Sequence, residues 1–156
     1  MIRCIPILGL LLAAAGCAPG LGDSPSEGVT PPAPAATPRA VFAEYPQFLF
    51  DAIAASCEGP GRKVVRPSTE ELRCEGLPPV EAAAALILDF EGTVEDLPRY
   101  VSSVAIAEAG GEYTVTADTY IRIPQTGGTA RIIRIPDPEL DALIRTVFEG
   151  AGGRLL

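Results

Sequence analysis

The sequence predicts an α+β domain in two layers: a mostly antiparallel sheet with an N-terminal and a C-terminal helix packed on one face. Two segments, residues 46–56 and 138–150, repeat apolar residues at helical spacing. Between them, residues 112–123 alternate apolar and polar side chains, as a strand with one buried face does. The order of helix, strands and helix favours two helices that cover one sheet.

The first half of the predicted domain contains a helix and three short strands. The helix spans Pro46–Ser56, because proline suits a first helical turn and the breakers at residues 59–61 end it. The other elements expected in this half are strands at residues 63–66, 71–74 and 84–90, the last preceded by a helical turn, and another helical turn at residues 95–100.

The second half is dominated by a predicted β-hairpin. Its strands are residues 101–108 and 112–123, and Gly110-Gly111 supplies the turn. A further strand is expected at residues 130–135.

The last predicted element is a helix that begins after Asp137 and ends at Gly150. Asp137 is a good N-cap residue and Pro138 fits the first helical position. The helix carries a continuous apolar stripe, which we expect to pack on the sheet: Leu140, Leu143, Ile144, Val147 and Phe148.

Composition excludes several classes of function. The chain has 156 residues, enough for one domain, and a net charge of −8. This charge argues against nucleic acid as a partner, since Lys and Arg are not in excess to neutralise phosphates. No histidine is present, which excludes Ser-His-Asp and Cys-His catalysis and zinc sites that use histidine. We therefore predict a protein that is not an enzyme and holds no cofactor.

The N-terminus has the pattern of an export signal. Arg3 precedes an apolar run from Ile5 to Ala15, which would span only about 16 Å as a helix. A membrane span needs about 20 such residues, so the run fits the apolar region of a signal peptide.

The end of this run, Ala14-Ala15-Gly16-Cys17, resembles the lipobox of bacterial lipoproteins. The resemblance implies cleavage after residue 16, acylation of Cys17 and attachment to the membrane through that lipid. Ala18 follows, where lipoproteins retained at the inner membrane often carry aspartate, which favours the periplasmic face of the outer membrane. Two alternatives remain open: an ordinary secretory signal that leaves Cys17 as a free thiol, and a cytosolic protein with an apolar N-terminus.

The resemblance divides the chain into three parts. Residues 1–16 are the signal peptide, and residues 17–40 form a disordered tether behind the acylated cysteine, rich in proline and without apolar periodicity. Residues 41–152 form the single α+β domain.

The cysteines then follow by parity. Cleavage would remove Cys4 and acylation would consume Cys17, which leaves Cys57 and Cys74 on the oxidising side of the membrane. A disulfide between these two is the simplest inference, and two buried free thiols are the alternative.

An acidic cluster at Asp89, Glu91, Glu95 and Asp96 is the first candidate site. Its spacing does not fit a calcium-binding EF-hand loop, so no metal is expected. On a strand, Asp89 and Glu91 would point to the same side, about 6–7 Å apart, as an acid/base pair could. The alternative is a solvated acidic loop.

Arginines beside a tyrosine are the second candidate site. Tyr120 and Arg122 lie on the polar face of the long strand, and Arg134 lies on its expected partner. They could contact an anionic ligand or an acidic partner. The alternative is pairing across the sheet with Asp118 and Glu112.

These observations predict a lipid-anchored cell-envelope protein with a small, non-catalytic interaction domain. Its partners would be the membrane, through Cys17, and an envelope protein or polymer. The alternative is a periplasmic module that binds or hydrolyses a small ligand, using Tyr120 and Arg122 or Asp89 and Glu91.

Overall fold

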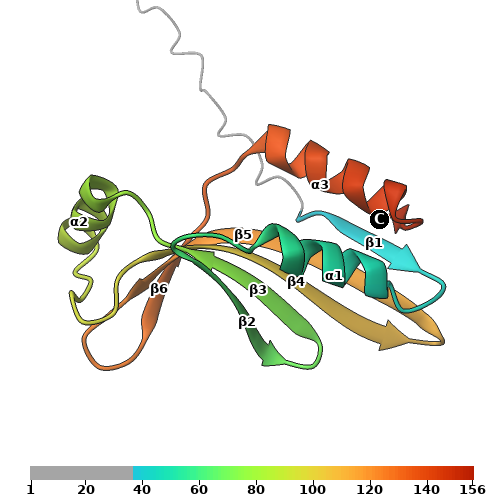
Figure 1. The fold of residues 1–156 in the computed structure, drawn as a ribbon, viewed down its shortest axis with the longest axis horizontal. Coiled ribbons are helices and arrows are strands. Elements are labelled where there is room, and N and C mark those ends of the chain that lie inside the picture. The colour runs from blue at the N-terminus through green and yellow to red at the C-terminus, as the bar shows by residue number, and fades with distance from the viewer. Residues whose placement is uncertain (1–36) are drawn as a thin grey trace, which may run out of the picture. The chain divides into compact units, whose positions relative to one another are not determined.

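Residues 37–156 are described by a computed structural model (Figure 1). The predicted signal peptide, the predicted lipidation site Cys17 and nearly all of the predicted tether lie outside the described residues. Within residues 37–156, no helix combines the length and the apolar character that crossing a membrane requires.

Three helices and seven strands make up the described part of the chain. In chain order they are β1 (Arg39–Phe42), α1 (Gln47–Ser56), β2 (Arg62–Ser68), β3 (Glu71–Gly76), α2 (Val80–Asp89), β4 (Arg99–Ala109), β5 (Glu112–Pro124), β6 (Ala130–Ile133), α3 (Pro138–Gly150) and β7 (Arg154–Leu155).

The seven strands form one antiparallel sheet, which confirms the predicted fold class. Its order is β2-β3-β4-β5-β1-β7, and β6 also pairs with β5. β1 lies along residues 113–116 of β5 and β6 along residues 121–124, so both occupy the edge of β5 that faces away from β4.

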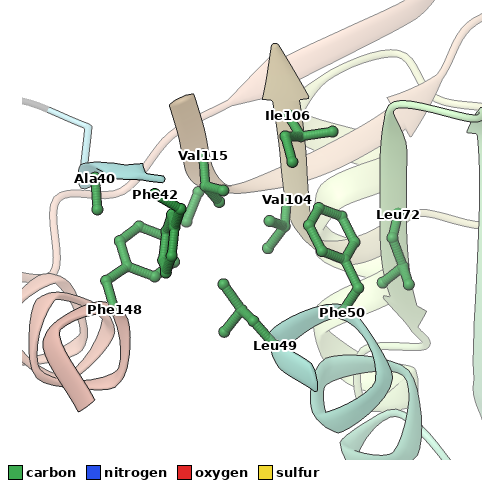
Figure 2. Close-up of a cluster of buried hydrophobic side chains, with 10 residues drawn as sticks. Ala40, Phe42, Leu49, Phe50, Leu72, Val104, Ile106, Val115 and Phe148 are labelled. Carbon is green, nitrogen blue, oxygen red and sulfur yellow. The ribbon is translucent and has the colours of Figure 1, made fainter. Parts of the chain in front are cut away.

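Both α1 and α3 lie on one face of this sheet, as predicted (Figure 1). Leu49 and Phe50 of α1 and Phe148 of α3 are buried in one apolar cluster with side chains from the sheet (Figure 2). The sheet residues in that cluster are Ala40, Phe42, Leu72, Val104, Ile106, Val115 and Ala117. We call this side of the sheet the helix face and the other side the open face.

The hairpin of β4 and β5 is confirmed. Its turn pairs Ala109 with Glu112, and Gly110 and Gly111 both have positive φ, at 66° and 84°. A turn of this hand matches the twist of the strands and is suited to glycine, because side chains disfavour positive φ.

The closing helix is also confirmed, with one difference in its packing. The Asp137 side chain accepts a hydrogen bond of 3.0 Å from the Leu140 N–H, which caps α3, and Pro138 is its first residue. Phe148 is buried, but Leu143 and Val147 are 59% and 46% exposed. The predicted apolar stripe is therefore wider than the surface that it covers on the sheet.

Two expected elements are wrong. Residues 84–90 do not form a strand: the alanines of residues 82–85 favour helix, and α2 continues through Asp89. Residues 95–100 do not form a helical turn, because β4 begins at Arg99.

The sheet also reaches beyond residues 41–152, the predicted domain. β1 includes Arg39 and Ala40, and β7 lies at residues 154–155. Both strands are short and pair with each other, and β1 also pairs with the distant β5.

Candidate functional site

The predicted disulfide is present and joins α1 to the sheet on the helix face. Cys57 caps the C-terminal end of α1 and is bonded to Cys74 of β3, with 5.6 Å between the two Cα atoms. Cys57 is almost fully buried. The bond therefore holds the end of α1 against the sheet.

Tyr120 and Arg134, two of the predicted contact residues, lie together on the open face. The Arg134 guanidinium lies 5.6 Å from the centre of the Tyr120 ring. It also forms an ion pair with Asp118, whose nearest oxygen is 2.6 Å away. That hydrogen-bonded pairing raises the pKa of Arg134, so the side chain remains cationic. This is the pairing with Asp118 that was predicted from the sequence as the alternative to a contact between Arg134 and an anionic ligand.

Arg122, the third predicted contact residue, is paired elsewhere. Its guanidinium lies 3.2 Å from a carboxylate oxygen of Asp96, in the loop before β4. Glu112, the other acidic residue considered as a partner, lies at the hairpin end of β5.

Further ion pairs cover the open face beside Tyr120. Arg73 and Glu71 lie 2.7 Å apart, and their hydrogen bond raises the pKa of Arg73. Glu75 is only 6% exposed and lies between Lys63, at 3.2 Å, and Arg99, at 3.6 Å. Lys63, Arg73 and Arg99 are thus neutralised by neighbouring carboxylates.

The titration of Tyr120 is changed by its place on the sheet. Its partial burial raises its pKa above the ordinary value of 10.0, and the positive charge of Arg73 opposes that effect. The phenol therefore stays protonated and neutral at pH 7.

The second candidate, Asp89 and Glu91, does not have the predicted geometry. Asp89 is the last residue of α2 and Glu91 follows in a turn with φ of 56°, so the two do not share one side of a strand. Both side chains are exposed. Among residues 37–156, no three Asp, Glu or Cys side chains cluster closely enough to hold a metal ion.

The helix face carries a groove that the sequence analysis missed. It has a volume of about 450 Å³ and runs between α1 and α3, with β4 and β5 as its floor. Leu49, Ile53, Ile144 and Phe148 supply apolar wall residues, and Val104 and Ala117 lie beneath them. Figure 2 shows Leu49 and Phe148 reaching into the core from their two helices. We call this feature the α1/α3 groove.

The α1/α3 groove continues along the uncovered part of the helix face. A second hollow of about 330 Å³ shares Ser102, Thr119 and Leu140 with it and extends to Tyr100. Ser102 and Tyr100 are exposed, because neither α1 nor α3 covers this part of β4. The result is one elongated apolar surface.

Exposed apolar side chains border the α1/α3 groove. Leu143 and Val147 line it from α3, one turn apart, and are about half exposed. Phe48 of α1 is 81% exposed and lies one turn before the groove residue Ala52. The signal in the sequence was the width of the apolar stripe on α3, but the width alone does not show which of its residues the sheet covers.

Comparison with known proteins assigns no family. The chain is 43% identical over 54 residues to the large ribosomal subunit protein uL10 of Oleidesulfovibrio alaskensis, a match that covers 34% of this chain and 30% of that protein. No protein-family model matches the chain. No solved structure matches it either.

Proposed function

We propose that this chain is a lipid-anchored cell-envelope protein whose α+β domain is a non-catalytic binding module, with the α1/α3 groove as its binding site. The observation that carries the proposal is the elongated apolar groove with Leu143 and Val147 exposed along its border. Contiguous exposed apolar surface on a domain of this kind is typical of an interaction site.

Binding is favoured over catalysis by the chemistry of the titratable groups. The chain contains no histidine, and the charged side chains around Tyr120 are paired with one another. Asp89 ends α2 and Glu91 lies in the exposed turn after it, so the two are not side by side on a strand. Neither feature favours the alternative of a small-ligand or hydrolytic module.

The anchor rests on the lipobox-like residues that end in Cys17. Mass spectrometry of the membrane fraction should find acyl chains on a peptide that begins at Cys17. The Cys17→Ser variant should carry no lipid. An unmodified Cys17 in protein recovered from the soluble periplasm would refute the anchor and leave the groove as a separate question.

The binding site is tested in cells with a photo-crosslinking amino acid. We expect Leu143→benzoylphenylalanine, in the full chain, to give one discrete crosslinked product in the membrane fraction. Ala105, which is exposed on the open face, is the matched control position and should give none. Crosslinking at Ala105 but not at Leu143 would refute the groove as the binding site.

A further inference from the structure

We propose that the occupant of the α1/α3 groove is an amphipathic helix of another envelope protein, with an aliphatic face and an excess of Lys and Arg beside it. This inference rests on the proposed function, because it names the partner of the same site. It is drawn from the shape of the groove, its exposed border and the charge of the two helices that form it.

The shape fits an elongated occupant. From Val104 to Tyr100 the floor strand β4 advances about 13 Å along the groove, the length of about nine residues of α-helix. The walls present apolar side chains at helical spacing, Leu140, Ile144 and Phe148 among them. Such ridges accept the side chains of a third helix laid against them.

The exposed border distinguishes a helix from a single acyl chain. A lipid chain would fill the floor of the groove and touch Leu143 and Val147 only where they face that floor, leaving their outer sides in water. A helix is about 10–12 Å wide including its side chains, so it can contact the floor and the border together. Helix-in-groove recognition uses apolar anchors at positions i, i+3, i+4 and i+7, which this surface can accommodate.

Charge favours a basic partner. The sequences of α1 and α3 contain four acidic residues, Asp51, Glu139, Asp141 and Glu149, and one basic residue, Arg145; they surround the groove and are not part of its lining. Glu139 lies one turn before Leu143, beside the groove border. Lys or Arg on the partner would therefore be attracted, whereas acidic side chains or anionic lipid headgroups would be repelled.

The same argument disfavours a second copy of this chain. Its most exposed apolar helix is α2, where Val80 and Leu88 are each 80% exposed. The charged residues of α2 are Glu81 and Asp89, both acidic, and the whole chain has a net charge of −8. Inserting α2 into the groove of another copy would bring like charges together.

The test uses the full chain in nanodiscs of zwitterionic phosphatidylcholine, and empty nanodiscs measure binding of the probe to lipid. The probe is a Leu/Lys peptide of about 14 residues, roughly 21 Å as a helix, with leucines on one helical face. A peptide of the same composition with alternating Leu and Lys tests the helical spacing. A Leu/Glu peptide with the first pattern tests the charge.

We expect saturable binding of the helical Leu/Lys peptide only, weakened several-fold by added salt. The double substitution Leu143→Gln and Val147→Gln should weaken it at least tenfold without changing the net charge. The control pair, Ala105→Gln and Ala107→Gln on the open face, should change it less than twofold. Thermal unfolding of each variant checks that the domain remains folded.

Several results would overturn the inference. Equal binding of the Leu/Glu or the alternating peptide would do so, and so would an affinity unchanged by the groove substitutions. In cells, crosslinks from position 143 to lipid, to a second copy or to an acidic or extended segment would also contradict it. A discrete protein partner without a basic helix would refute this inference and leave the binding site at the groove standing. No product at position 143 would refute the proposed site itself.

Discussion

Reducing the Cys57–Cys74 disulfide should destabilise the domain by about 3 kcal/mol. The two cysteines are 17 positions apart, and the chain-entropy model gives about 10 cal/mol/K for closing a loop of that length, hence about 3 kcal/mol at 25 °C. The assay is denaturant unfolding of residues 37–156, with and without a reductant that does not absorb. In thermal unfolding of the same domain, we expect reduction to lower the melting temperature by roughly 10 °C.

Controls separate the crosslink from the packing of the buried sulfur. The double variant Cys57→Ala and Cys74→Ala should be insensitive to reductant, and it should be slightly less stable than the reduced protein, because Cys57 is buried. If reductant changes the free energy of unfolding by less than about 0.5 kcal/mol, the loop-closure reasoning is refuted. Because Cys57 ends α1, reduction should also weaken peptide binding in the α1/α3 groove.

Three further substitutions test single contacts. Asp137→Ala removes the side-chain cap of α3 and should cost about 1 kcal/mol of unfolding free energy, whereas Asp137→Asn should cost much less. Glu75→Gln leaves Lys63 and Arg99 without their buried carboxylate and should cost about 1–3 kcal/mol in chemical denaturation. Tyr120→Phe should remove one phenol that titrates above the ordinary pKa of 10.0 from an absorbance titration at alkaline pH. Because the pKa of Tyr120 is raised in the fold, its neutral form contributes stability that is complete below pH 10 and is lost as the pH rises through the raised pKa, so Tyr120→Phe should flatten the alkaline loss of stability.

Local signals explain which elements the sequence predicted well. The hairpin of β4 and β5 combines a glycine turn with strict alternation, and both are properties of neighbouring residues. The start of α3 depends on Asp137 and Pro138 alone. The disulfide followed from counting cysteines once an export signal was predicted, so it needed no structural information.

Non-local pairing explains what was missed. The four residues of β1 form a strand because they pair with residues 113–116 of β5 and with β7, and nothing near β1 in the sequence indicates those partners. The run of residues 86–90, apolar except for Asp89, was too short to separate strand from helix by its period. There the helix propensity of the preceding alanines decided the outcome.

The candidate site shows the same division. Polar residues such as Tyr120, Arg122 and Arg134 are conspicuous in a sequence, yet Arg122 and Arg134 have carboxylate partners in the fold. The walls of the groove consist mainly of ordinary apolar residues. Leu143 becomes noticeable only when the positions of α1 and α3 on the sheet show that neither the sheet nor α1 covers its side chain.

The exposed border is also energetically consistent with a weak but specific contact. Burying a leucine or valine side chain completely contributes about 1.5–3 kcal/mol, and Leu143 and Val147 are about half exposed. Covering the two would therefore contribute about 1.5–3 kcal/mol together, a factor of roughly 10–100 in affinity. That is a modest gain in affinity in free solution.

If Cys17 holds the domain at a membrane whose other proteins are confined to the same space, however, the effective concentration of a partner is high and a modest contact suffices. On this reasoning the anchor and the groove depend on each other: releasing the chain from the membrane by Cys17→Ser should reduce crosslinking from position 143 even though the groove is unchanged.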